Sequence, residues 1–200
     1  EKLDYDEKIK SKFIKQLDLK LYDKHSDFLS IPLLLTIMLI TYTETAEIPE
    51  KMHIFYEQAF DTLFFRHDAS KSMYKREIKS KLAIDDFKKI LSILSISSYL
   101  KSEINFTKSI LLEHIRKAKK LLQIDFSNED YIYDLLKSVC ILIQEGNYIT
   151  YTHRSFQEYF SAYCITSGII PNVSKILETI LMERKYDNVL SLSFEINREL

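Results

Sequence analysis

Glycine and proline are scarce in this chain of 200 residues, which contains two glycines and three prolines. Tight turns and loops depend on them, because glycine reaches positive φ angles and proline fixes its own φ angle. A protein rich in sheets or loops needs more of both. The scarcity therefore predicts a mainly α fold with long helices and few sharp turns.

Sequence motifs for metal binding and catalysis are also missing. Gly146 and Gly168 cannot form the G-x-x-x-x-G-K-[ST] loop that holds nucleotide phosphates. No H-E-x-x-H or C-x-x-C sequence occurs, and the five histidines are scattered, which argues against a metal site. Ser155 lies near His153, but helix capping explains this serine, and no third member of a catalytic triad is evident. We therefore expect no catalytic residue and no metal.

A Walker B strand is not evident either. The segment Leu82-Ala-Ile-Asp-Asp86 ends in carboxylates as such a strand does, but its apolar run is short and leads into helical periodicity. Capping of a helix by Asp85 or Asp86 explains the carboxylates better. We therefore do not expect this chain alone to hydrolyse ATP.

Long apolar runs and cysteines are few, and the chain carries almost no net charge. The longest apolar run, Phe28–Tyr42, contains Pro32 and is shorter than the ~20 residues of a membrane span. The net charge of −1 gives no overall attraction to nucleic acid or anionic membranes.

Cys140 and Cys164 lie in apolar contexts, so we expect buried thiols and a reducing, cytoplasmic compartment. The chain begins with Glu1 and shows no signal peptide, and we expect a fragment of a longer protein.

Helical periodicity is what the chain does contain, with an apolar share of 46% that is ample for a core. Apolar residues recur every three to four positions in 4–21 and 49–64, and together with the apolar segment 32–43 between them they predict a three-helix bundle. Pro32 suits the first turn of the second helix. That helix is apolar nearly all round, so we expect it to be central to its bundle.

After a polar break at 67–72, the elements expected from the sequence follow the order helix, strand, helix, helix, strand, strand. Thr107 and Ser127 are expected to cap two of these helices, and Glu145-Gly146 predicts a β-hairpin. This order is typical of a winged-helix domain with a β-hairpin wing. We therefore predict three parts: a helical domain at 1–70, a winged-helix domain at 71–168 and the start of a further helical domain at 169–200.

The segment 148–163, YITYTHRSFQEYFSAY, organises this part of the chain. Ser155 and Glu158 have the S-x-x-E spacing of a capping box, in which the serine caps the helix and the glutamate reaches back. His153 and Arg154 precede the helix, where backbone N–H groups favour anions. We therefore hypothesise that His153 contacts a phosphate. One helical face carries four aromatic residues, which predicts burial in a core: Phe156, Tyr159, Phe160 and Tyr163.

Residues His153–Ala162 also resemble the H-x-S-F-Q-E-[YF]-[FL]-A-A segment in the winged-helix part of NACHT-type STAND NTPases, the family of NOD-like receptors and bacterial antiviral NTPases. Two further segments are similar to the family's first helical domain, which follows its nucleotide-binding core. Ile31–Met38 resembles N-P-L-L-L-T-[LI], although Ile31 replaces a frequent asparagine. Ile48–Ala59 resembles L-P-x-x-x-x-x-L-Y.

The resemblance implies a regulatory role with ADP or ATP as cofactor. It places Pro32 near the adenine and His153 against the β-phosphate of ADP, with Mg held by a nucleotide-binding core that this chain lacks. The implied partners are that core and the sensor region of the same full-length chain. Closure over ADP maintains the resting state, and exchange for ATP allows opening and assembly into a homo-oligomer. The implied setting is innate or antiphage defence in the cytoplasm.

A winged-helix DNA-binding transcriptional regulator is the alternative. The third helix of such a domain normally enters the major groove, but here it begins with the acidic segment Asn128–Asp134, which repels phosphates. The basic run Arg116–Lys120 suits the C-terminal end of its helix. We therefore expect no direct contact with nucleic acid. A helical scaffold without a ligand of its own is the third interpretation.

Overall fold

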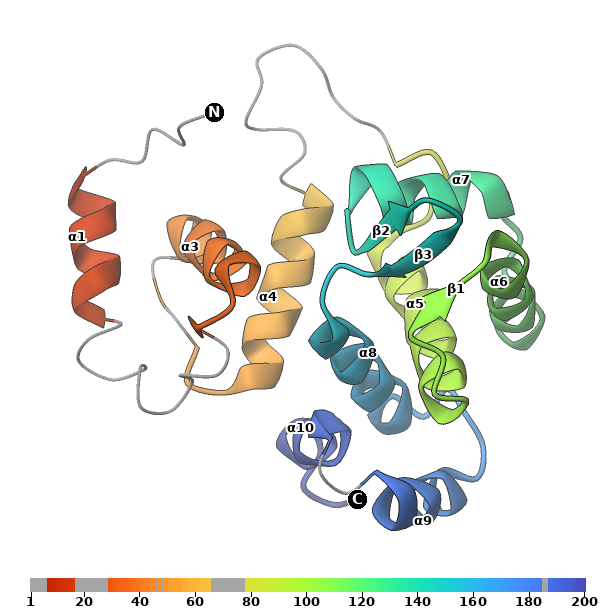
Figure 1. Ribbon diagram of the computed structural model, residues 1–200. Coiled ribbons are helices and arrows are strands. Elements are labelled where there is room, and N and C mark those ends of the chain that lie inside the picture. Colours follow the sequence, from red (N-terminus) through yellow and green to blue (C-terminus); the bar gives the residue numbers. More distant parts are fainter. Residues whose placement is uncertain (1–6, 17–28, 46, 48, 66–77, 185–186) are drawn as a thin grey trace. The chain divides into compact units, whose positions relative to one another are not determined.

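The computed structural model describes residues 7–16, 29–45, 47, 49–65, 78–184 and 187–200 (Figure 1). Helices dominate the described residues, which confirms the mainly α fold. Two compact units are present, Glu1–Thr62 and Leu63–Leu200, and the predicted domain boundaries stay predictions. The elements are α1 (Glu7–Gln16), α3 (Pro32–Thr45), α4 (Met52–Phe65), α5 (Ile84–Leu100), β1 (Asn105–Phe106), α6 (Lys108–Leu122), α7 (Asn128–Tyr133), the π-helix η3 (Asp134–Ser138), β2 (Leu142–Glu145), β3 (Tyr148–Tyr151), α8 (Arg154–Thr166), α9 (Val173–Glu183) and α10 (Asn188–Ile196).

In the first unit, α3 buries one stripe of side chains. Pro32 is its first residue, as predicted, and is exposed. Leu33 is also exposed, so this helix, although apolar nearly all round, is not buried on every side. The physical reason is that the neighbours of α3 in this small unit cover one side, where the ring of Phe13 on α1 lies 5.3 Å from that of Tyr42. The buried stripe has helical spacing: Leu34, Ile37, Met38 and Tyr42.

The second unit has the predicted winged-helix order from α5 to β3. Its three strands form an antiparallel sheet in the order β1-β3-β2, and the β2–β3 hairpin is the wing (Figure 1). Glu145 pairs with Tyr148 across the hairpin turn, where Gly146 has a φ angle of +61°. A positive φ angle favours glycine because it lacks a Cβ atom.

Two of the helix caps predicted for this unit are present in the structure, and a third is not. Thr107 Oγ1 accepts a hydrogen bond from the backbone N–H of Ile110, and Ser127 Oγ accepts one from Asp130, as predicted. Ala83 is the N-cap residue of α5, so capping by Asp85 or Asp86 is wrong. Both aspartates lie in the first turn instead, where carboxylates interact favourably with the helix dipole.

The π-helix after α7 contains a buried aspartate that the sequence does not reveal. Asp134 has no exposed surface. Its carboxylate accepts hydrogen bonds from the backbone N–H groups of Lys79 (2.9 Å) and Ser80 (2.8 Å) and from the hydroxyl of Ser138 (2.9 Å). Three donors compensate for the burial of the charge. The contact ties the segment before α5 to the end of the third winged-helix helix.

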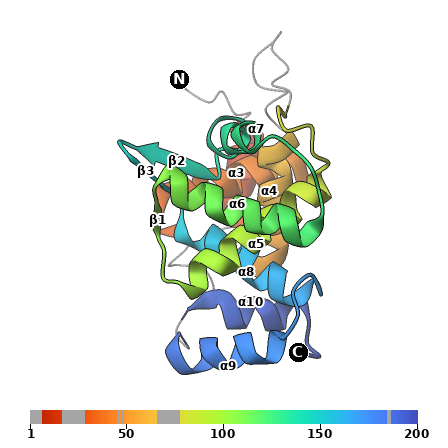
Figure 2. The same cartoon turned by 90° about the vertical axis from the view of Figure 1, so that its right-hand side faces the viewer.

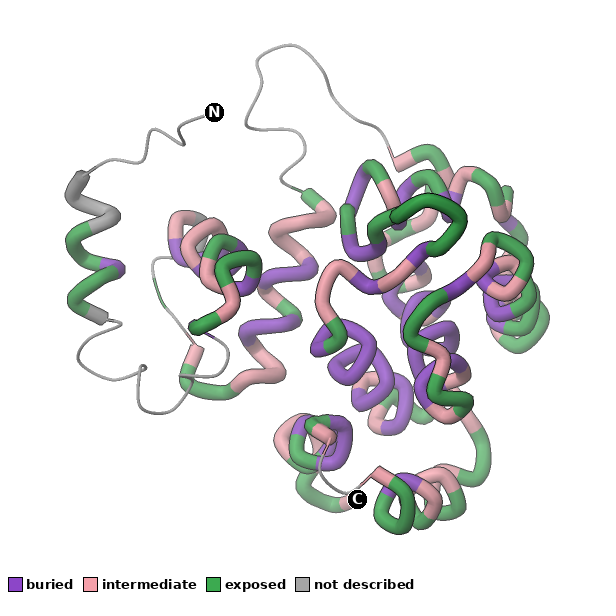
Figure 3. The backbone as a smooth tube through the Cα atoms, viewed as in Figure 1, coloured by how far each residue is buried: buried purple, intermediate pink, exposed green. Residues whose placement is uncertain are grey.

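α8 packs against α5 on one side and α10 on the other (Figures 1 and 2). Its residues are buried along most of its length (Figure 3). Phe156 and Phe160 have no exposed surface and Tyr159 is buried, which confirms the predicted aromatic face, whereas Tyr163 is partly exposed. α8 is therefore the central helix of the second unit.

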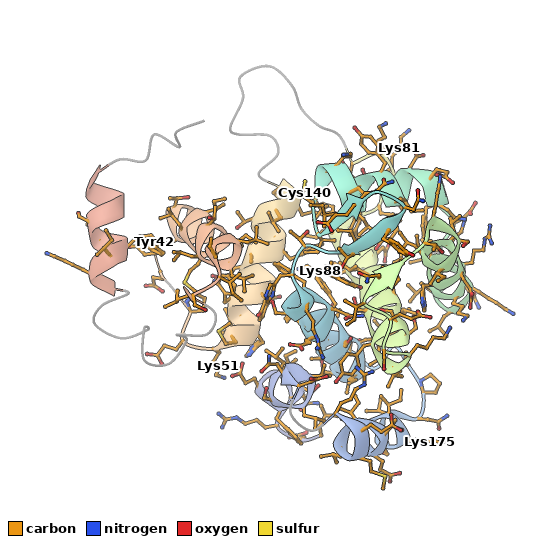
Figure 4. All side chains as sticks on the ribbon, viewed as in Figure 1. Tyr42, Lys51, Lys81, Lys88, Cys140 and Lys175 are labelled. Carbon is orange, nitrogen blue, oxygen red and sulfur yellow. The ribbon has the colours of Figure 1, made fainter. Side chains whose placement is uncertain are left out.

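The two cysteines have different surroundings, and neither forms a disulfide. Cys164 on α8 is buried, as predicted. Cys140 is exposed, so the prediction that both are core thiols is wrong for this residue (Figure 4). It lies between η3 and β2 with a φ angle of +56°, in a surface connection that the apolar sequence around it does not indicate. Across the residues with assigned positions, every helix is too short or too polar to cross a membrane.

Candidate functional site at the start of α8

His153 is the N-cap residue of α8, with an extended backbone (φ −149°, ψ 140°). Its Nδ1 atom accepts a hydrogen bond from the backbone N–H of Ser155 at 3.2 Å, as a capping oxygen does. The predicted capping box is therefore wrong, because the helix begins before Ser155 and encloses it. Glu158 does not reach back to cap the helix; its carboxylate contacts Arg154 and Asn188.

Ser155 fixes the orientation of the His153 ring. The Ser155 side chain is buried, and its Oγ atom lies 2.7 Å from His153 Nδ1. Because Nδ1 accepts the backbone N–H of Ser155, this nitrogen carries no proton, and its single lone pair is shared between the backbone N–H and the hydroxyl of Ser155. A neutral imidazole with an accepting Nδ1 carries its proton on Nε2. Ser155 therefore selects the tautomer in which Nε2–H is a donor.

Burial also lowers the pKa of His153 below its ordinary value. The lowered pKa favours the neutral ring, and the two hydrogen bonds to Nδ1 require it. Among the described residues, the hydrogen bonds of this ring all use Nδ1. The site thus offers a neutral Nε2–H donor of fixed tautomer at the N-terminal end of α8, where the helix dipole favours negative charge. This chemistry suits a phosphate oxygen.

Arg154, the other predicted neighbour of an anion, is held by two carboxylates. Its Nη2 atom lies 2.9 Å from Asp187 Oδ2, and its Nε atom lies 3.2 Å from Glu158 Oε1. The guanidinium therefore serves the packing of α8 against α10. His153 remains the residue of this turn best suited to a phosphate.

Pro32 and His153 belong to different compact units, and their assignment to one nucleotide site stays a prediction. Pro32 is exposed at the first position of α3. Its ring offers apolar contact without a hydrogen-bond donor, which is compatible with stacking on a base. His153 is partly buried at the start of α8.

A buried histidine network was missed by sequence reasoning. His114 on α6 has no exposed surface, and its Nδ1 and Nε2 atoms lie 2.7 Å from Ser97 Oγ and 2.5 Å from Glu103 Oε2. Ser97 donates its own proton to the carbonyl of Leu94, so it accepts from Nδ1–H. In this arrangement the serine accepts from the imidazole, whereas the serine of a catalytic triad donates to it. The network joins α5 to α6.

The groove between α7 and the wing has mixed charge. It has a volume of about 400 Å³ and includes Glu129, Asp130 and Tyr133 from α7. Lys108 is paired with Glu129 at 2.8 Å, and Lys79 Nζ lies 3.5 Å from the centre of the Tyr133 ring. Both lysines are thus engaged within the protein. This surface lacks the excess of positive charge that contact with DNA phosphates requires.

Metal ligands and related proteins give no further information about this site. Nowhere in the described ranges do three histidine, cysteine or carboxylate side chains gather as metal ligands. Comparisons with protein-family models, curated proteins and solved structures found no match to this chain.

Proposed function

We propose that this chain is the regulatory helical and winged-helix portion of a NACHT-type STAND NTPase signalling switch. The observation that carries the proposal is the state of His153. An N-cap position, two hydrogen bonds to Nδ1 and a lowered pKa together make this ring a neutral Nε2–H donor. The winged-helix order around it and the segment 153–162 on α8 support the same assignment.

The residues present fit the phosphate part of ADP. His153 would hold a β-phosphate oxygen through Nε2–H, and the N-terminal end of α8 would add the favourable field of its dipole. Pro32 would supply an apolar surface for the adenine, as the resemblance implies. ADP supplies the negative charge that joins the winged helix to a nucleotide-binding core elsewhere in the full-length chain. That core also holds Mg.

In this proposal the protein switches because the contact between His153 and ADP exists only in the closed resting state. A hydrogen bond to a charged group contributes about 1.5–3 kcal/mol, which shifts an equilibrium by about tenfold to more than a hundredfold. The contact of His153 with ADP favours the closed resting state. Exchange for ATP removes the contact, and the protein then opens and assembles into a homo-oligomer. A cytoplasmic role in innate or antiphage defence belongs to this proposal.

The test compares nucleotide content and DNA binding in the full-length protein. After purification and denaturation, chromatography should detect ADP at close to one equivalent. A gel-shift series from low to high salt should show no complex with duplex DNA, because α7 presents Glu129 and Asp130 where a DNA reader needs cations. Absence of nucleotide together with a salt-sensitive DNA complex would instead establish the alternative, a winged-helix transcriptional regulator.

A further inference from the structure

The first turn of α8 is joined to the first turn of α10 by charged contacts. Asp187 is the N-cap residue of α10. Its Oδ2 atom lies 2.9 Å from Arg154 Nη2 and accepts a hydrogen bond from Tyr99 OH at 3.0 Å. Arg184 Nη1 lies 3.9 Å from the same oxygen. One carboxylate thus binds donors from α5, α8 and the end of α9.

A second contact runs parallel to the first. Asn188, the first residue of α10, donates from Nδ2 to Glu158 Oε2 at 2.9 Å, and Glu158 also pairs with Arg154. Burial raises the pKa of Glu158, while Asn188 and Arg154 favour its charged form. We call these four residues, Arg154, Glu158, Asp187 and Asn188, the α8–α10 clasp. On α8, Arg154 follows His153 directly and Glu158 lies five positions after it.

The centre of the clasp is Asp187. Burial raises the pKa of Tyr99, and the neighbouring Asp187 charge raises it further, so the phenol stays protonated and donates. The guanidinium of Arg184 lies 4.5 Å from the centre of the Tyr99 ring and donates to Ser102 Oγ. A pocket of about 200 Å³ beside these residues is lined in part by Arg154 and Arg184.

We infer that Asp187 is a positioning residue for His153, through which α9 and α10 control the phosphate contact. Arg154 follows His153 directly in the chain, so anchoring its guanidinium on α10 restrains the peptide that carries the N-cap. When α10 separates from α8, Arg154 loses Asp187 and Glu158 loses Asn188. The first turn of α8 then frays, and Ser155 no longer holds the ring. This inference rests on the proposed function of His153.

The test is a double-mutant cycle on ADP release from the full-length protein. Asp187→Ala should speed release about tenfold in the wild-type background and cause no further increase in the His153→Ala background, because the two residues act on one contact. Asp125→Ala is the matched control. Asp125 is exposed and paired with Lys119 at 2.8 Å, away from the clasp, and its loss should leave release unchanged. Asp187→Glu, which keeps the carboxylate, should restore most of the wild-type rate.

The outcomes separate the inference from the proposed function. Equal acceleration by Asp187→Ala in both backgrounds, or no acceleration by it in either, overturns the positioning role. If His153→Ala itself leaves release unchanged, the proposed function fails instead. If the alanine variant does not fold, Asp187→Asn replaces it, because asparagine keeps the size and shape of the side chain and removes only its charge. It should show the same dependence on His153.

Discussion

Replacement of His153 by alanine should speed ADP release from the full-length protein about tenfold or more. The substitution removes the Nε2–H donor, and a hydrogen bond to a charged group contributes about 1.5–3 kcal/mol. The measurement is displacement of a fluorescent ADP analogue by excess unlabelled nucleotide. Faster release should be accompanied by a higher level of oligomer without the natural trigger, because the closed state loses the contact that favours it.

Two further variants separate the phosphate contact from the helix cap. His153→Asn keeps a good N-cap residue but lacks the Nε2–H donor, so it should release ADP about as fast as the alanine variant while retaining more of the helix stability. Ser155→Ala keeps the ring but removes the hydroxyl 2.7 Å from Nδ1, and its release rate should be intermediate. Wild-type release by both His153 variants would remove His153 from the nucleotide site.

Phe160→Ala should lower the free energy of unfolding of the second unit by about 3–5 kcal/mol, the cost of a large cavity in a packed core. Phe160 has no exposed surface, and α8, which carries it, packs against both α5 and α10. The loss therefore weakens the support of the His153 turn as well as the core. Denaturant unfolding of the chain, followed by circular dichroism, measures the change.

Phe194→Ala on α10 is the matched control for this substitution. Phe194 is 48% exposed, and removing a side chain that is half in water should cost about 1 kcal/mol. Equal losses at Phe160 and Phe194 would contradict the central position of α8 in the second unit.

Local patterns predicted much of the fold. Turn chemistry at Gly146 and capping at Thr107 and Ser127 depend on residues a few positions apart, and the structure agrees at all three. The capping box failed for a local reason too. His153 and Ser155 can each accept a backbone N–H, and the S-x-x-E spacing does not show which residue has the extended backbone.

The rest of the site depends on contacts between distant segments. Arg154 meets Asp187 across 33 positions, and Asp134 meets Lys79 across 55. No periodicity within one helix indicates such pairs, because they follow from how α8 packs on α10 and how η3 packs on the preceding segment. The sequence therefore suggested His153 as a phosphate ligand without revealing that Ser155 selects its tautomer or that Asp187 anchors its neighbour.

A crystal structure of the full-length protein bound to ADP tests the central claim most directly. We expect His153 Nε2 to lie within ~2.7–3.2 Å of a β-phosphate oxygen, the range of an N–H···O hydrogen bond, with Nδ1 still accepting from Ser155. A structure in which ADP is bound and His153 Nε2 lies beyond hydrogen-bonding reach of every phosphate oxygen would contradict it.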